Sequence, residues 1–492
     1  MSIPSPEEIQ RIIQRVQLRL GETAGSDGAP GSAGAALRGD QGLVEAAAAD
    51  LGEGIHATVP EAVAAAKRAF EAFQPAGLEL RKRIIASVRA SMLEHAESLA
   101  EMAHAETGLG RAADKVIKNR LVTTKAPGPE DLEPQTVTGD HGMMVTEWAP
   151  FGVVGAITPT TNPTSTMIYN TISVVSAGNA VVFNVHPGAK QVSAHNIRLI
   201  NQAIVAAGGP ADLVTAVAEP TIESAKDLMH HPDVRLLLVT GGPGVVQEAL
   251  KTDKRAVTAG PGNPPVVVDQ TADVDQAARD IVRGASFDNN VVCTDEKTTI
   301  AVRGVTDRLV SAMGRHGAYV LKEHELRRLE RVIFREPGPA GKPGKIDPRW
   351  IGKNAGVILA EIGIRVDDDV RLIVARVPNE HNLVWTEQMM PVMPVTEAPD
   401  IDAAIDLARR SEHNFRHSAG IYSTNVDTIT KMARVMNCSI FVANGPTFSG
   451  LGHGGEGFAS FSIATPTGDG MTRPRTFSRE RRLSLVGSLR IV

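Results

Sequence analysis

Apolar residues between positions 55 and 122 recur at intervals of three and four, a spacing that predicts helices. The clearest helical stretches are Glu61–Phe73, Leu80–His95 and Ala112–Val122. From Met144 onward, short apolar runs typical of buried strands alternate with further helical stretches. The expected strands are Val153–Thr158, Ala180–Val185, Leu213–Val217, Val234–Val239 and Val266–Val268. Helices are expected between them at Gln191–Ala206, Ile222–Met229 and Val245–Lys251. This alternation predicts βαβ units, and therefore an α/β fold with a parallel sheet.

A second α/β stretch runs from Val274 to about Phe441 and is interrupted by a loop rich in proline and glycine, Pro337–Pro348. The last strand-like run of the chain is Leu483–Val492. With 492 residues the chain is too long for one ordinary domain, and two or three domains are expected.

The first twenty residues form a separate amphipathic pattern. Ser5-Pro6-Glu7-Glu8 is a capping box with proline at the first helical position, and an apolar stripe follows at helical spacing. Residues 21–50 are rich in Gly, Ala and Ser, a composition that favours a flexible linker. A short helix on a linker cannot bury its own stripe, so residues 1–20 are expected to dock on a partner. The alternative is a helix that folds back on its own chain.

Composition excludes several classes of protein. The net charge of −5 argues against nucleic-acid binding as the main function. The cysteines, Cys293 and Cys438, are too few for a disulfide framework and favour a reducing compartment. The N-terminus lacks the apolar run of a signal peptide. The segment from Trp148 to Ala189 has no charged side chain, but prolines, asparagines and glycines interrupt it, so it is expected to be buried rather than to span a membrane. A soluble, intracellular protein is expected.

A candidate nucleotide site follows the expected strand ending at Val239. Thr240-Gly241-Gly242-Pro243-Gly244 would let backbone N–H groups and a helix N-terminus approach a pyrophosphate. The motif is not the G-x-G-x-x-G fingerprint, and a tight turn without a ligand is an equal alternative.

Cys293 is the candidate nucleophile, because a loop cysteine beside helix termini and polar side chains can ionise at neutral pH. The alternative is a buried structural thiol, which suits Cys438 better. A nucleophile that forms tetrahedral adducts also needs oxyanion donors, and Asn162 is the candidate amide donor unless it is only a turn residue.

Several motifs in order resemble the aldehyde dehydrogenase superfamily. The opening motif Phe151–Pro159 with Asn162-Pro163 is followed by Thr240-Gly241-Gly242, Cys293 and Glu387–Val392. Further motifs resemble the CoA-acylating branch, and in particular the propionaldehyde and acetaldehyde dehydrogenases of bacterial microcompartments. They are Ala259–Pro265, Phe287–Cys293, Asn444-Gly445-Pro446 and Gly452–Phe458.

The resemblance implies a Rossmann-type dinucleotide domain, an α/β catalytic domain and a small oligomerisation sheet. The NAD(P)-binding domain would comprise residues 51–136 and 149–262, and the catalytic domain residues 263–474. The oligomerisation strands would lie in residues 137–148 and 475–492, and a homodimer or homotetramer is implied.

Two departures from the hydrolytic members of the family sharpen the expectation. Those enzymes carry a glutamate that activates the deacylating water, where this chain has Thr258 or Ala259. A thioester on Cys293 would then persist until the CoA thiol attacks it. The hydrolytic enzymes also hold the adenosine ribose with a lysine and a glutamate, where this chain has Asn184 and Pro187. These residues leave the choice between NAD and NADP open: the absence of a carboxylate removes one barrier to a 2′-phosphate but supplies no cation to bind it. NAD is the expected cofactor, with NADP as the alternative.

The resemblance implies oxidation of a short-chain aldehyde, propionaldehyde or acetaldehyde, with CoA as co-substrate and Cys293 and Asn162 as catalytic residues. Its cofactor contacts would be Thr158, Pro159, Thr160, Gly241, Gly242 and Glu387. The rivals are a hydrolytic or semialdehyde dehydrogenase, a catalytically silent microcompartment scaffold and, more weakly, acyl phosphate formation. No metal site is expected, because His413 and His417 lack further ligands. Residues 1–20 would act as an encapsulation peptide that contacts a shell protein or another enzyme, which places the protein in the cytoplasm inside a microcompartment.

Overall fold

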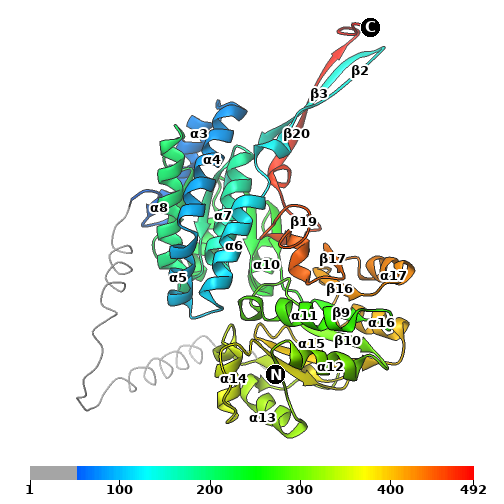
Figure 1. The fold of residues 1–492 in the computed structure, drawn as a ribbon. Coiled ribbons are helices and arrows are strands. Elements are labelled where there is room, and N and C mark those ends of the chain that lie inside the picture. Colours follow the sequence, from blue (N-terminus) through cyan, green and yellow to red (C-terminus); the bar gives the residue numbers. More distant parts are fainter. Residues whose placement is uncertain (1–51) are drawn as a thin grey trace, which may run out of the picture. The chain divides into compact units, whose positions relative to one another are not determined.

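Six parallel strands form the first sheet, in the order β1-β6-β5-β4-β7-β8 (Figure 1). The computed structural model describes residues 52–492, so the expected helix over 1–20 and linker over 21–50 lie outside the described residues. The strands are β1 (Ile55–His56), β4 (Val153–Ile157), β5 (Ala180–Asn184), β6 (Val214–Val217), β7 (Val234–Thr240) and β8 (Arg255–Ala259). The strands expected here are confirmed to within one residue at each end.

Eight helices accompany this sheet in the described part of the chain. They are α3 (Val59–Phe73), α4 (Leu78–Glu94), α5 (Ala96–Thr107), α6 (Ala112–Lys125), α7 (Pro163–Ser176), α8 (Lys190–Ala206), α9 (Ile222–His230) and α10 (Pro243–Leu250). Helix α3 begins with a capping box in which Thr58 and Glu61 each accept the other's backbone N–H. Helices α3 and α9 contact the sheet and each other, while α7 and α8 contact the sheet under α4, α5 and α6. Every residue of α7 is buried, as expected for the uncharged segment that contains it.

The second sheet has seven parallel strands in the order β11-β14-β15-β10-β9-β16-β17. Its strands are β9 (Pro265–Val268), β10 (Thr298–Val302), β11 (Ala318–Val320), β14 (Leu372–Arg376), β15 (Val392–Ala398), β16 (Ser418–Tyr422) and β17 (Ile440–Ala443). The accompanying helices are α11 (Val274–Ala285), α12 (Thr306–Arg315), α13 (Glu323–Ile333), α14 (Ala355–Glu361), α15 (Asn382–Trp385), α16 (Ile401–Ser411) and α17 (Val426–Met436). Two small antiparallel pairs complete the description: β12 (Phe334–Glu336) with β13 (Lys345–Ile346), and β18 (Ile463–Ala464) with β19 (Gly470–Met471). The fold is therefore α/β with two parallel sheets, as expected.

A three-stranded antiparallel sheet extends away from both parallel sheets (Figure 1). It consists of β2 (Gln135–Gly139), β3 (Gly142–Pro150) and β20 (Ser478–Val486), and we call it the arm. The expected strand Leu483–Val492 is wrong at both ends, because β20 starts at Ser478 and stops at Val486. Its first half reads Ser-Arg-Glu-Arg-Arg, and an edge strand that is exposed along nearly its whole length leaves no apolar alternation to recognise.

The hydrophobic core of the first sheet also contains side chains from residues 461–477, near the C-terminus. Phe461, Ile463, Ala464 and Phe477 are buried in the same apolar cluster as β4 to β7. The sequence-based division at residue 474 assigned most of this segment to the catalytic domain. The apolar pattern of a segment indicates that it is buried, but it does not indicate which hydrophobic core contains it.

Candidate active site

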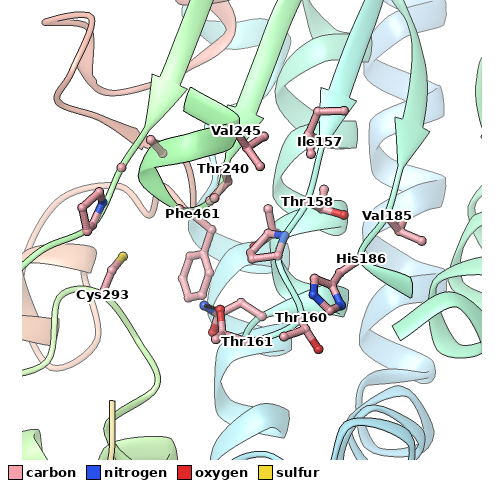
Figure 2. Close-up of a pocket in the computed structure, with 18 of the residues that line it drawn as sticks. Ile157, Thr158, Thr160, Thr161, Val185, His186, Thr240, Val245, Cys293 and Phe461 are labelled. Carbon is pink, nitrogen blue, oxygen red and sulfur yellow. Dashed lines mark hydrogen bonds between the residues drawn. The ribbon is translucent and has the colours of Figure 1, made fainter. Parts of the chain in front are cut away.

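A cavity of about 840 Å³ opens at the carboxyl ends of the strands of the first sheet. Its lining includes every site residue expected from the sequence: Cys293, Asn162, Thr158, Pro159, Thr160, Gly241, Gly242 and Glu387. Figure 2 shows Cys293 on a loop across the cavity from the strand ends that carry Thr158 and Thr240. Residues separated by more than two hundred positions are thus brought to one site.

The cavity lies where the order of the first sheet reverses. From β4 the chain proceeds through α7 to β5 on one side, whereas β7 pairs with the other side of β4. The loops after β4 and β7 diverge at such a switch point and leave a crevice at which α/β sheets bind ligands. Gly242 is the N-cap of α10. The buried Thr158 hydroxyl has no hydrogen-bond partner among the described residues. A helix N-terminus and an unpaired hydroxyl in a long, largely apolar cavity fit a dinucleotide.

The side chains after β5 are already engaged by their neighbours. Asn184 donates to the Thr221 carbonyl at 3.3 Å and accepts from the Ser224 hydroxyl at 2.6 Å. His186 accepts the backbone N–H of Gly188 at 3.0 Å, and burial lowers the pKa of its imidazole, which is therefore neutral at pH 7. This end of the cavity presents neither a carboxylate nor a cation from these two positions.

The loop that carries Cys293 has a backbone conformation unusual for side chains larger than glycine. Asp288, Asn289 and Asn290 have φ angles of 43°, 54° and 66° in succession. Asp and Asn tolerate this left-handed region better than other non-glycine residues, because their short side chains can bond to the local backbone. Each of the three is fully or almost fully buried, and their side chains make hydrogen bonds in different directions.

These hydrogen bonds tie the loop to four parts of the chain. Asn289 donates to the Gly352 carbonyl at 2.8 Å, and Asn290 donates to the Ala285 carbonyl at 2.7 Å. Lys297 donates to the Asn290 side chain at 2.7 Å and to the Val292 carbonyl at 3.1 Å. Asp288 accepts from α6, as described below. The position of Cys293 is therefore held by side chains rather than by a regular element.

The surroundings of Cys293 disfavour its thiolate. The residue is half-buried, and burial followed by the neighbouring Glu387 carboxylate raises the pKa of the thiol to about 12, while Lys297 partly offsets them. The expectation that this cysteine ionises at neutral pH is wrong for the chain by itself. The thiol becomes a nucleophile only when a base accepts its proton or a bound cation stabilises the thiolate.

Asn162 is placed at the N-cap of α7, but its side chain does not cap the helix. Its Oδ1 accepts a hydrogen bond from Lys118 Nζ at 2.6 Å, and its Nδ2 donates to the Thr161 hydroxyl at 3.1 Å. The turn-residue alternative predicts a local backbone bond, which the structure does not place at this side chain. An NH₂ group has two N–H donors, so the second N–H of Nδ2 can donate to a ligand in the cavity that Asn162 lines.

Glu387 is not an ordinary surface carboxylate. It is half-buried, accepts the backbone N–H of Gly262 at 3.4 Å, and burial raises the pKa of its carboxyl group. The acidic side chains in the lining are Glu387 and Glu248, and Glu248 pairs with Lys251 at 3.4 Å. Thr258 and Ala259 are both buried, and Ala259 is part of the lining. No carboxylate occupies the position at which hydrolytic relatives are expected to carry their base.

The sequence assigned no role in the site to three buried groups: Lys118 was not singled out, Asp288 was only part of a motif, and His417 was weighed only as a metal ligand. Lys118 donates to both Asp288 and Asn162. His417 is buried against Gly262, where an added Cβ would lie 3.0 Å from both the His417 ring and the Cys293 carbonyl. Burial lowers the pKa of His417 to about 4, so the ring is neutral at pH 7. The available signal was the pair Lys115 and Lys118, two charges on the face that α6 buries.

Comparison with known proteins agrees with this geometry. Residues 45–321 and 371–461 match the aldehyde dehydrogenase family. The chain is 47% identical over 440 residues to the acetylating acetaldehyde dehydrogenase EutE of Salmonella typhimurium, covering 89% of this chain and 94% of that protein. It is 42% identical over 441 residues to a CoA-propanoylating propanal dehydrogenase of the same organism, with the same coverage of 89% and 94%.

A solved structure provides the same comparison in three dimensions. The Rhodopseudomonas palustris propionaldehyde dehydrogenase, crystallised with bound CoA and an acylated cysteine, superposes with a TM-score of 0.87 at 44% identity. The match covers 90% of this chain and 100% of that one. A propionaldehyde dehydrogenase from the fucose utilisation microcompartment of Clostridium phytofermentans gives a TM-score of 0.86 at 40% identity, with the same coverage. The chain belongs to the aldehyde dehydrogenase family.

Proposed function

We propose that the protein is a CoA-acylating aldehyde dehydrogenase that converts acetaldehyde or propionaldehyde, CoA and NAD⁺ into an acyl-CoA and NADH. The observation that carries this function is the cavity in which Cys293 faces a dinucleotide crevice while positions 258 and 259 hold no carboxylate. The acetylating and propanoylating relatives support the choice of CoA and of a short-chain aldehyde.

Cys293 and Asn162 carry out the acylation step. The Cys293 thiol releases its proton to water, its sulfur bonds to the aldehyde carbon, and the carbonyl electron pair moves to the oxygen. Asn162 Nδ2 and the Cys293 backbone N–H stabilise that oxyanion, and loss of one such donor typically costs about 2.7–4 kcal/mol of barrier. The carbonyl would re-form, leaving a thioester on Cys293, when the aldehyde hydrogen leaves as hydride. A dinucleotide bound in the crevice supplies a hydride acceptor and a cationic ring that favours the thiolate.

The dinucleotide contacts come from three parts of the cavity. Thr158, Pro159 and Thr160 follow β4 and lie beside the crevice, and Gly241 and Gly242 present backbone N–H groups at the start of α10. Glu387 hydrogen-bonds the ribose next to the nicotinamide. We propose NAD as the cofactor, with NADP as the alternative: Asn184 and His186 supply no positive charge for a 2′-phosphate, although Lys226 also lines the cavity. A kcat/KM higher with NADP⁺ than with NAD⁺ would contradict this choice.

The missing base decides the fate of the acyl-enzyme. With Thr258 and Ala259 in place of a carboxylate, no group at this position activates water against the thioester on Cys293. The CoA thiol then attacks the acyl carbon, the carbon–sulfur bond to Cys293 breaks, the proton of the CoA thiol returns to the Cys293 sulfur, and acyl-CoA leaves. Glu387 is the acidic side chain of the cavity lining whose charge acts on the thiol, and it is the candidate base for a hydrolytic rival.

The deciding experiment is NADH production by the purified protein from acetaldehyde and propionaldehyde, with and without CoA, beside Cys293→Ala. Sustained turnover is expected only with CoA, and none is expected from the variant. Equal turnover without CoA would identify a hydrolytic enzyme, whereas no turnover under either condition would favour a silent scaffold.

We further propose the domain division that the resemblance implies. The dinucleotide domain comprises residues 51–136 and 149–262, and the oligomerisation strands lie in residues 137–148 and 475–492. The catalytic domain comprises residues 263–474, except that Phe461, Ile463 and Ala464 pack in the core of the first sheet. The arm carries exposed apolar side chains that support a homodimer or homotetramer.

Residues 1–20, on the linker 21–50, are proposed to act as an encapsulation peptide that places the enzyme inside a bacterial microcompartment in the cytoplasm. The Clostridium relative named for a microcompartment supports this location. Within the described residues, no helix is long and apolar enough to cross a membrane. Co-purification with shells by a chain that lacks residues 1–20 would contradict the docking role.

A further inference from the structure

A buried lysine on α6 contacts the carbonyl oxygen of the Asn162 side chain. Lys118 Nζ lies 2.6 Å from Asn162 Oδ1, and the two residues are only 1% and 7% exposed. An ammonium group has three donors and no acceptor, so an amide beside it must present its oxygen and turn its NH₂ group away. Lys118 therefore determines the orientation of this carboxamide.

The orientation matters because the two ends of a carboxamide have opposite effects on a developing negative charge. The NH₂ group donates to an oxyanion, whereas the carbonyl oxygen repels it. The Thr161 hydroxyl, which now accepts from Asn162 Nδ2 at 3.1 Å, is itself both a donor and an acceptor. It would accommodate either orientation of the amide, so it cannot select one as the ammonium group does.

Lys118 is in turn fixed to the loop that carries the nucleophile. Its Nζ donates to the Asp288 carboxylate, which also accepts from Lys115 Nζ at 3.0 Å and from the backbone N–H of Arg111 at 2.7 Å. Asp288 is the first of the three left-handed residues that precede Cys293. One side chain on α6 thus links the loop of the nucleophile to the side chain of the oxyanion donor.

We propose that Lys118 is a positioning residue for the acylation step: its ammonium group holds the Asn162 NH₂ group toward the aldehyde oxygen. That oxygen gains the carbonyl electron pair when the sulfur of Cys293 bonds to the aldehyde carbon. This role rests on the proposed function. The positive charge next to Oδ1 also polarises the amide, which makes its N–H groups stronger donors to the oxyanion.

Lys115 provides a matched control on the same helix. It is 1% exposed and donates to the same Asp288 carboxylate, but its second partner is the Thr161 carbonyl at 3.4 Å rather than Asn162. Lys115→Met and Lys118→Met each remove one buried charge beside Asp288. Only Lys118→Met removes the hydrogen bond to the oxyanion donor.

The experiment measures the rate of the first turnover by rapid mixing without CoA. NADH formation reports the acylation of Cys293. Asn162→Ala is expected to slow this step by about 10²–10³-fold, and Lys118→Met by about tenfold or more, since the bond it loses is charge-assisted. The variant that combines Lys118→Met with Asn162→Ala should be slower than Asn162→Ala alone by no more than the factor measured for Lys115→Met, because both lysines donate to Asp288 but only Lys118 acts through Asn162. Lys115→Met should be slowed less than Lys118→Met, and the dinucleotide Kd should be the same in all variants.

Two results would overturn the role of Lys118. The first is a double variant whose loss is the product of the single losses, and the second is an equal loss in Lys115→Met and Lys118→Met. If Lys118→Met fails to fold, Lys118→Gln replaces it. Glutamine keeps a donor but can present either end of its amide, so an intermediate rate is expected. A first turnover that is normal in the unchanged protein but is followed by hydrolysis would reject CoA transfer and leave Lys118 testable.

Discussion

Cys293 is a neutral thiol in its own surroundings because burial and the Glu387 carboxylate both oppose the thiolate. A carboxylate that hydrogen-bonds the ribose would therefore also suppress the nucleophile until a cationic ring is bound. Such an arrangement protects the cysteine from oxidation and alkylation when no dinucleotide is present, since the thiolate is the reactive form.

Replacement of Glu387 should make Cys293 more reactive toward iodoacetamide. Glu387→Gln removes the charge that raises the thiol pKa, and a decrease of about 1 in that pKa increases the thiolate fraction about tenfold. Alkylation of the Cys293 peptide, followed by mass spectrometry between pH 8 and 10, measures the effect and separates Cys293 from Cys438. In the unchanged protein the rate should rise with pH throughout this range, because the thiol pKa is about 12.

Glu248→Gln is the control for this substitution. Glu248, on α10, lines the same cavity but pairs with Lys251, the residue after that helix, and does not contribute to the thiol pKa. An equal acceleration in both variants, or none in Glu387→Gln, would show that the Glu387 charge does not control the thiol.

At the scale of elements, the conformation of the loop before Cys293 depends on close contact with α6 and with the turn that precedes α6. Gly110 has a φ of +69°, and a Cβ added there would lie 2.0 Å from Asp288 Oδ1. The neighbouring Arg111 N–H donates to the same oxygen. Glycine at this position permits both the left-handed backbone and the contact of the turn with the Asp288 carboxylate.

Gly110→Ala should therefore destabilise the protein more than an ordinary glycine substitution. Gly208→Ala is the matched control, because Gly208 has a φ of +87° and nothing within 4 Å of an added Cβ. Both variants incur the left-handed backbone cost of about 1–2 kcal/mol, and Gly110→Ala adds an overpacking cost of about 1–3 kcal/mol. Denaturant unfolding measures the free energy of unfolding of each variant. Equal decreases in the two variants would show that the Asp288 loop moves to accommodate the methyl group without loss of stability.

At the scale of the whole molecule, the arm places apolar side chains in solvent. Leu483 and Leu485 are 61% and 37% exposed, and residues two apart on a strand share one face. They lie opposite Val145 and Met143 of β3, which are themselves only partly buried. A contiguous exposed apolar face of this kind is typical of a protein interface.

Charges on this face should dissociate the oligomer. The double variant with Leu483→Glu and Leu485→Glu is expected to sediment as a smaller species than the unchanged protein, because burying two unpaired carboxylates opposes association. Ser484→Glu, on the other face of the same exposed strand, is the control and should leave the proposed oligomer largely intact. An unchanged sedimentation coefficient in the double variant would exclude the arm as the interface.

The sequence alone determined the α/β class, most helices and strands of the first sheet, and the candidate residues of the site. These follow from periodicity and from motifs contiguous along the chain, which depend on neighbours within a few positions. β20 was misplaced because an exposed edge strand has no apolar alternation to read.

Only the tertiary structure decided the features of the site that depend on segments distant in sequence. The bonds that orient Asn162 and hold the Cys293 loop come from α6, 44 residues before Asn162 and 170 before Asp288. The high pKa of Cys293 arises from burial and from Glu387, which lies in a different part of the chain. Electrostatic and hydrogen-bonding effects act through distance in space, and only folding of the two sheets against one cavity sets those distances.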